Sequence, residues 1–285
     1  DETGGKSRET TGTDDRKHVL TAKGEGSGGQ VTHAASGWLP AAVDEVGTRS
    51  RCDVAVWSGM DAGSLKDGAR FVKDAVSLDR PVLLRGVLFH PTTRLKDWSR
   101  GALRARAANE SFQVMQYDDE TGEMSDSHTW RRVTLAEWLV DMRSEGRRRL
   151  PDYIFDQSGG ATRRSLRRPI SRLFPWRGHL HAETPGLYLG AHGSGNAFHY
   201  HQQTWNALVA GRKRWLLYPP NVSFYSELHP SEWIRRRERS GLEERTKALV
   251  GDRLPAALEC EQQAGDVLFV PRLWGHGTIN LGETL

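Results

Sequence analysis

Short runs of alternating or continuously apolar residues dominate the second half of the chain, and glycine or turn-forming residues separate most of them. The runs are 186–190, 197–199, 205–210, 214–218, 257–262 and 266–270. Alternation with a period of two is typical of a strand that buries one face, and a short unbroken apolar run is typical of a fully buried strand. We therefore expect each run to form a strand, with a helix over 230–250 between the fourth and the fifth.

The first half of the chain mixes strand and helix periodicities. Strands are expected over 54–57, 81–84, 111–117 and 151–155, and helices over 62–76, 95–107 and 135–144. The helix over 62–76 is expected to turn one side inward, which carries Leu65, Ala69, Val72 and Val76. Thr134 is expected to cap the helix over 135–144, whose inner side would carry Leu135, Trp138, Leu139 and Met142.

Helical patterns come early in the chain and the dense series of short strands comes late. This order predicts a mainly β protein, built as a sandwich or barrel with flanking helices. Residues 1–36 are rich in Gly, Ser, Thr and charge and contain no aromatic residue, so they are predicted to form a disordered tail. Residues 37–285 are predicted to form one domain, because this length can bury a sizeable core.

Charge gives little indication of a nucleic-acid partner. The net charge of +4 is a small surplus of 40 basic over 36 acidic residues. The arginine-rich segment 143–172 is interrupted by Asp152, Asp156 and apolar residues, so we interpret it as a solvated basic face and expect no nucleic-acid binding. No apolar run approaches the about 20 residues that span a bilayer, so no membrane span is expected.

Three features point to the secretory pathway. The chain begins at Asp1 without a methionine, which suggests that an N-terminal piece such as a signal peptide has been removed. Asn109 and Asn221 each begin an Asn-x-Ser acceptor pattern for N-glycosylation. Cys52 and Cys260 are either two separate buried thiols or, if their strands are neighbours in an oxidising compartment, a disulfide.

Three histidines stand out as metal ligands. His199 and His201 are two residues apart, so in a strand they would point to the same face. His276 follows the turn-like Gly265-Asp266 and Pro271, which would bring a third imidazole beside them. Neutral imidazole binds Fe(II), Zn(II) and Cu(II), and three such ligands leave coordination positions open. For an isolated His-x-His pair, two histidines without a metal would be the simpler interpretation. Three histidines on these two segments favour a metal site.

The segments around these histidines resemble the jumonji C-terminal (JmjC) oxygenases of the cupin superfamily, in particular the small branch that consists of this domain alone. The likeness runs from about Val54 to Leu285 and is most specific in the string from Trp205 to Trp215. It implies a double-stranded β-helix (jelly-roll) core that holds Fe(II) through a His-x-Asp/Glu…His triad, with 2-oxoglutarate bound to the metal. It also implies residence in the lumen of the endoplasmic reticulum or elsewhere in the secretory pathway, with the cytoplasm or nucleus as the alternative.

The resemblance assigns roles to six residues. His199 and His276 would be the first and third metal ligands, and His201 would stand where the acidic ligand normally sits. Lys213 would meet the distal carboxylate of 2-oxoglutarate. Asn206 matches an amide that faces the cosubstrate, and Asn280 matches the polar position at the far end of the same motif.

Two departures from the family pattern bear on activity. A neutral His201 in place of a carboxylate leaves the site more positive and changes how it would bind metal and oxygen. The sequence also stops at Leu285, before the strand that closes the family's barrel, so either the sequence is truncated or the barrel has an exposed edge.

Three functions follow as hypotheses. The first is an Fe(II)- and 2-oxoglutarate-dependent oxygenase that hydroxylates a protein side chain. The second is a non-catalytic cupin that serves as a binding or scaffold protein in the secretory lumen. The third is a Zn(II)-binding cupin, since three histidines and a water form a familiar zinc arrangement. The sequence does not indicate the substrate or protein partner, the metal or the oligomeric state.

Overall fold

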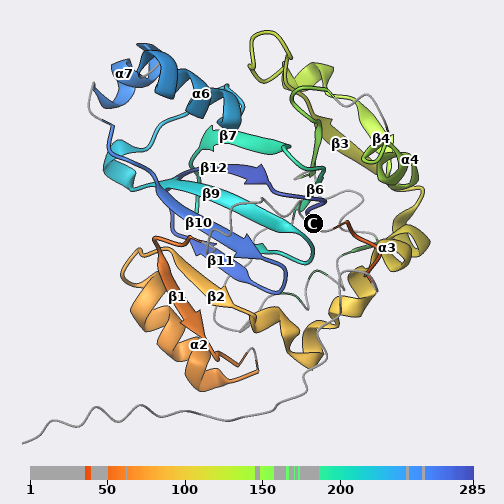
Figure 1. The fold of residues 1–285 in the computed structure, drawn as a ribbon. Helices are drawn as coiled ribbons and strands as arrows, with labels where there is room; N and C mark the ends of the chain where they lie inside the picture. The colour runs from red at the N-terminus through yellow and green to blue at the C-terminus, as the bar shows by residue number, and fades with distance from the viewer. Residues whose placement is uncertain are drawn as a thin grey trace, which may run out of the picture.

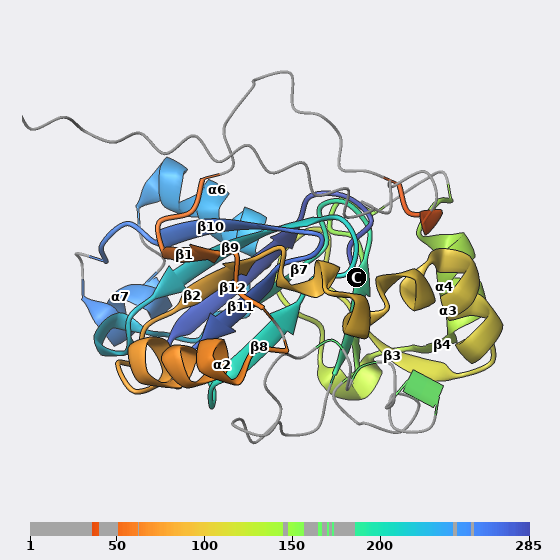
Figure 2. The same cartoon turned by 90° about the horizontal axis from the view of Figure 1, so that it is seen from below.

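The computed structural model describes residues 36–39, 51–61, 63–144, 148–156, 165–166, 170, 173, 186–241, 244–251 and 254–285. The described residues form three four-stranded sheets with helices around them (Figure 1, Figure 2). The predicted tail, residues 1–36, lies outside the described part of the chain apart from Ser36, so its disorder stays a prediction. None of the described helices is both long and apolar enough to cross a membrane.

Two of the sheets are built largely from the second half of the chain. In the first sheet all neighbours are antiparallel, in the order β10 (Leu258–Gln263), β9 (Arg212–Tyr218), β12 (Gly275–Asn280) and β7 (Gly195–His199). The second sheet has the order β1 (Ala55–Ser58), β2 (Val82–Arg85), β11 (Val267–Val270) and β8 (Thr204–Ala207). Only its β1–β2 pair is parallel.

These two sheets bury their facing sides against each other. Trp215 and Cys260 of the first sheet share one hydrophobic cluster with Leu83 and Leu268 of the second, and the latter two side chains are fully buried. Because side chains alternate along a strand, the neighbours of Leu83 point to the opposite face, where they pack on helix α2 (Leu65–Phe71). Each fully buried leucine stabilises the fold by about 1.5–3 kcal/mol relative to an exposed one.

Helices and a third sheet cover the outside of this pair. Helix α6 (Pro230–Ser240) places Trp233 on Phe198 of β7, and α7 (Glu244–Val250) follows it at the same end of the molecule (Figure 1). The third sheet has the order β4 (Arg132–Thr134), β3 (Ser111–Met115), β5 (Tyr153–Asp156) and β6 (Leu187–Gly190). It carries α3 (Arg100–Ala107) and α4 (Leu135–Asp141), the latter begun by the predicted cap Thr134 in a capping box with Glu137.

The observed fold confirms the predicted mainly β architecture with flanking helices and is consistent with a cupin core. Several local expectations were wrong. The single helix expected over 230–250 is two helices, α6 and α7, and the helix expected over 95–107 is a 3-10 helix, Leu95–Trp98, followed by α3. Ala69 is exposed, and the inward side instead carries Gly68, Phe71 and Ala75, which are three and four residues apart and so share one side of the helix. Residues 275–280, expected to follow a turn with no strand of their own, form the central strand β12.

Candidate metal centre

The three predicted histidines lie together at one end of the paired sheets. His199 is the last residue of β7 and is directly opposite His276 of β12, while His201 lies just beyond the end of β7. The ring centroids are 4.3 Å apart for His199 and His276, and 5.3 and 5.0 Å from these to His201. One ring nitrogen of each histidine lies within 4.8 Å of the other two, which is a spacing that could hold a metal ion.

Backbone carbonyls fix the tautomer of all three rings. Nδ1 of His199 lies 2.8 Å from the carbonyl oxygen of Ala197, and Nδ1 of His276 lies 2.9 Å from that of Trp274. In His201 the partner is the carbonyl oxygen of Gln202 at 2.6 Å. A carbonyl oxygen only accepts, so each Nδ1 carries the proton and each Nε2 keeps a free lone pair. Metal-binding histidines are commonly oriented in this way.

Burial keeps two of these rings neutral. Loss of solvation lowers the pKa of His199 to about 4 and the pKa of His276 well below its ordinary value, with the neighbouring imidazoles adding to both effects. At neutral pH these two histidines are therefore already in the neutral form that binds a cation. His201 is exposed and forms the open side of the site.

Lys213 is a buried cation on β9. Its side chain is only 3% exposed, and its Nζ donates hydrogen bonds to the hydroxyl of Tyr153 and to Oδ1 of Asn280, both at 2.9 Å. No carboxylate of the described residues forms an ion pair with it, and loss of solvation lowers its pKa to about 7. A buried ammonium without a counterion is costly, and an anionic ligand would relieve that cost.

The two predicted amides take different positions. Asn280 accepts from Lys213 and its amide donates to Ser194 Oγ at 2.9 Å, which holds both polar side chains in place. Asn206 lies opposite Leu268 across β8 and β11, so its side chain faces the space between the two sheets. Its Oδ1 is buried and has no hydrogen-bond partner among the described residues.

Sequence reasoning missed Tyr153. It lies on β5 of the third sheet, 60 residues before Lys213, and its buried hydroxyl accepts the lysine's hydrogen bond. Loss of solvation raises the pKa of Tyr153 well above its ordinary value, so its hydroxyl stays protonated at neutral pH. No local motif surrounds this tyrosine, and only the packing of the third sheet against β9 could have indicated it.

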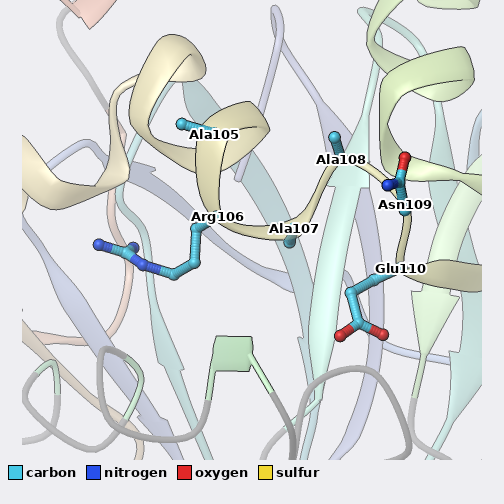
Figure 3. Close-up of a pocket in the computed structure, with 6 residues that line it drawn as sticks. All are labelled: Ala105, Arg106, Ala107, Ala108, Asn109 and Glu110. Carbon is cyan, nitrogen blue, oxygen red and sulfur yellow. The ribbon is translucent and has the colours of Figure 1, made fainter.

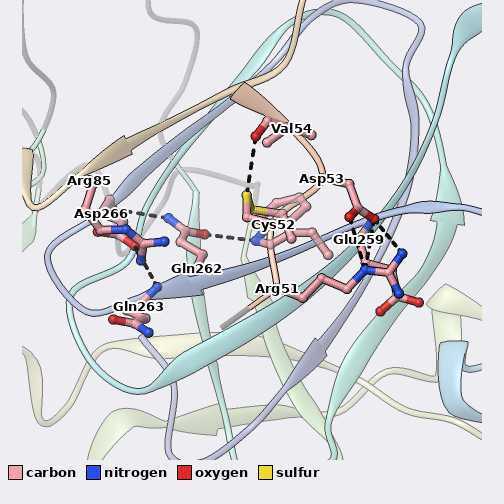
Figure 4. Close-up of a disulfide and its surroundings, with 11 residues drawn as sticks. Arg51, Cys52, Asp53, Val54, Arg85, Glu259, Gln262, Gln263 and Asp266 are labelled. Atoms are coloured by element: carbon pink, nitrogen blue, oxygen red, sulfur yellow. Dashed lines mark hydrogen bonds and ion pairs between the residues drawn. A yellow bond between two sulfur atoms is a disulfide. The ribbon is translucent and has the colours of Figure 1, made fainter. Parts of the chain in front are cut away.

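Cys52 and Cys260 form a disulfide between the segment before β1 and strand β10 (Figure 4). The backbone of the same segment pairs with β10, where Asp53 N–H donates to the carbonyl of Glu259 at 2.7 Å and Glu261 N–H donates to that of Arg51 at 2.8 Å. Cys260 is fully buried in the cluster between the sheets. The disulfide thus joins the outer strand of one sheet to the chain that enters the outer strand of the other.

Both predicted glycosylation asparagines are exposed. Asn109 follows α3 and lines a surface pocket formed by residues 105–110, which contains none of the three histidines (Figure 3). Asn221 lies in a short 3-10 turn after β9. Ser223, which completes its acceptor pattern, has a structural role of its own because its Oγ accepts from Gly275 N–H at 2.8 Å.

The arginine-rich segment is described only in part. Arg143, Arg148 and Arg149 form ion pairs with Glu283, Asp152 and Glu232, respectively. Six further arginines of this segment lie outside the described residues: Arg147, Arg163, Arg164, Arg167, Arg168 and Arg172. The described arginines are thus neutralised within the fold.

Two packed, largely antiparallel sheets with three imidazoles at one end form an arrangement that is consistent with a cupin and could hold a metal ion. The sequence model of the cupin-like domain matches residues 68–281, and the chain therefore belongs to the cupin-like family. Among known proteins it is similar to JmjC domain-containing protein 8 of Homo sapiens, with 29% identity over 273 residues that cover 90% of each chain.

Two other relatives carry names that state an activity. Over 102 residues the chain is 31% identical to the 2-oxoglutarate and iron-dependent oxygenase JMJD4 of Gallus gallus, covering 35% of this chain and 24% of the relative. Over 226 residues it is 25% identical to the bifunctional arginine demethylase and lysyl-hydroxylase psr-1 of Caenorhabditis briggsae, covering 72% and 54%. The family therefore includes oxygenases that depend on iron and 2-oxoglutarate.

Proposed function

We propose that this protein is an Fe(II)- and 2-oxoglutarate-dependent oxygenase that acts on a protein side chain. One observation carries the proposal: three imidazoles turn free nitrogens toward one another, and β9, the strand beside β12, carries a buried lysine with no carboxylate partner among the described residues. Relatives named as 2-oxoglutarate and iron-dependent oxygenases support it.

The residues present fit both groups. His199, His201 and His276 would hold the metal through Nε2, since each Nδ1 is taken by a carbonyl. Bound Fe(II) and 2-oxoglutarate together would supply the oxidation of an unactivated C–H bond. Lys213 would bind the distal carboxylate as a charged donor held by Tyr153 and Asn280, and the unpartnered Oδ1 of Asn206 would face the same enclosed space.

Lys213→Met tests the cosubstrate half of the proposal. Removal of one partner from a buried charged pair costs about 2–5 kcal/mol, so the affinity for 2-oxoglutarate should fall at least about 30-fold. The measurement is an anaerobic titration of the Fe(II)-loaded chain with 2-oxoglutarate, followed by the visible charge-transfer band, with succinate release as a second readout. The control is Lys73→Met, an exposed lysine that should leave the titration unchanged. No band and no succinate with the unaltered chain would contradict the proposed function.

A second candidate function is a non-catalytic cupin that binds a metal or a partner. The observation that favours it is His201, a neutral and exposed side chain where the family places a carboxylate. Three neutral ligands leave the full charge of a divalent ion uncompensated, and a set of imidazoles alone suits Zn(II) as well as Fe(II).

His201→Asp is expected to strengthen Fe(II) binding about tenfold or more, which is about 1.4 kcal/mol, because an ionised carboxylate offsets part of the charge of the divalent ion and a neutral imidazole does not. Anaerobic competition with a chromophoric chelator measures the affinity. His192→Asp adds the same charge at an exposed histidine outside the cluster and should have little effect. Equal Fe(II) affinity of the His201→Asp variant and the unaltered chain would show that residue 201 does not reach the metal.

We also propose that the protein works in the secretory pathway, in the lumen of the endoplasmic reticulum. Disulfides persist in oxidising compartments and are rare in the cytosol. The Cys52–Cys260 disulfide supports this location, and the two exposed acceptor asparagines are compatible with it.

A further inference from the structure

Exposed apolar side chains gather around the open side of the metal centre. Leu273, Tyr225 and Leu78 are 43%, 50% and 52% exposed, and they are three of the eight large apolar side chains that are exposed among the described residues. Two of them are tied directly to the strand end that carries His201. Leu273 N–H donates to the carbonyl of His201 at 2.8 Å, and the Tyr225 hydroxyl donates to the carbonyl of Tyr200 at 2.7 Å.

Leu273 is held in a conformation that leucine rarely adopts. Its φ is +61°, in the left-handed region where a Cβ crowds the backbone. The carbonyl of Leu273 accepts from Ser223 Oγ at 2.8 Å, so hydrogen bonds fix the backbone on both sides of this residue. This strained backbone presents an apolar side chain to solvent beside a metal ligand. Strained residues of this kind are typical of binding surfaces and active sites.

The remaining neighbours are rigid and carry cations. Trp274 Nε1 donates to the carbonyl of Asp79 at 3.1 Å, which joins the loop of Leu78 to the loop of Leu273. The ring of Tyr225 packs against that of Tyr200 in a tilted arrangement, with ring centroids 4.3 Å apart. The two joined loops expose Arg272 and Arg80 against the single acid Asp79, and a further exposed acid, Glu227, lies near Tyr225 in the chain. Arg272 is thus the charged residue next to Leu273 in the chain.

We propose that Leu273, Tyr225 and Arg272 recognise the substrate of this site: an extended polypeptide segment that carries a large apolar side chain flanked by acidic residues. The apolar side chain packs between Leu273 and Tyr225, and a flanking carboxylate faces Arg272. This deepens and rests on the proposed function, because it sets which side chains can approach the metal centre. A bulky anchor with charge of opposite sign beside it is the usual composition of a peptide hot spot.

The test uses an array of nine-residue peptides that differ only at the central residue and its two neighbours. It is probed with the full chain without added metal or 2-oxoglutarate, so that binding is measured independently of turnover. Peptides with a central Phe or Leu and acidic neighbours should bind best. Leu273→Asn, which suits the left-handed conformation, should lower their binding at least about fivefold while raising the thermal midpoint of the protein. Arg272→Glu should shift the preference to basic neighbours.

Leu249→Asn and Arg104→Glu are the matched controls, since both residues are exposed on helices away from the metal centre. An array whose preferences are the same for the unaltered chain, Leu273→Asn and Arg272→Glu would overturn the proposal. So would light scattering that shows a dimer which Leu273→Asn dissociates, because the surface would then bind a second copy. If the unaltered chain releases no succinate but binds the peptides with the expected preferences, the proposed oxygenase function is contradicted and the proposed peptide-binding surface is still supported.

Discussion

Replacing His276 with alanine is expected to lower the affinity of the chain for Co(II) by at least about 100-fold. Loss of a residue that only hydrogen-bonds to a metal ligand already lowers metal affinity by up to about 100-fold, and loss of the ligand itself should cost at least as much. His276 is the best buried of the three histidines, lies opposite His199 and has its Nδ1 occupied by the carbonyl of Trp274. Its Nε2 is therefore preorganised, and no other described side chain of the cluster could replace it. Co(II) is the probe because its visible absorption reports both occupancy and geometry.

His192→Ala is the matched control, since it removes an exposed imidazole outside the cluster and should leave Co(II) binding unchanged. Circular dichroism and the thermal midpoint establish that His276→Ala still folds. If a folded His276→Ala variant bound Co(II) as tightly as the unaltered chain, the three rings would not form a metal site.

The strands of the second half were the easiest part of the fold to predict. Alternation along 212–218 and the apolar run 267–270 are local signals that survive in the structure. Strand β12 was missed because Gly275 and Gly277 weaken the strand pattern. A Cβ at Gly277 would lie 3.3 Å from the ring of Phe198 on the neighbouring strand β7, and this close approach joins residues too far apart in the sequence for a local pattern to indicate it.

The metal ligands could be predicted for a different reason. His199 and His201 are close in the chain, and the resemblance to a known family linked them to His276. The hydrogen bond from Lys213 to Tyr153 could not be predicted in this way, because it depends on how a third sheet packs against β9. The same holds for the binding surface around Leu273, since exposure and φ are properties of the folded chain.

Loss of the Cys52–Cys260 disulfide is expected to lower the free energy of unfolding by about 3–5 kcal/mol. The bond joins residues 208 apart, so it restricts the unfolded chain strongly. In the folded chain the backbone bonds of Asp53 and Glu261 already hold the segment beside β10, so the disulfide stabilises mainly by limiting the unfolded state. The variant is Cys52→Ser with Cys260→Ala, which avoids placing a hydroxyl in the buried position.

Urea unfolding of this variant and of the unaltered chain, with and without a dithiol reductant, measures the difference. Arg51→Ala is the control in the same segment, because it removes only the exposed ion pair with Asp53, and exposed ion pairs contribute little to stability. Denatured protein without reductant should show no free thiol. Two free thiols, or a reductant that leaves the unfolding midpoint of the unaltered chain unchanged, would contradict the disulfide. Either result would also remove the main support for a secretory location, because the oxidising compartment is inferred from this bond.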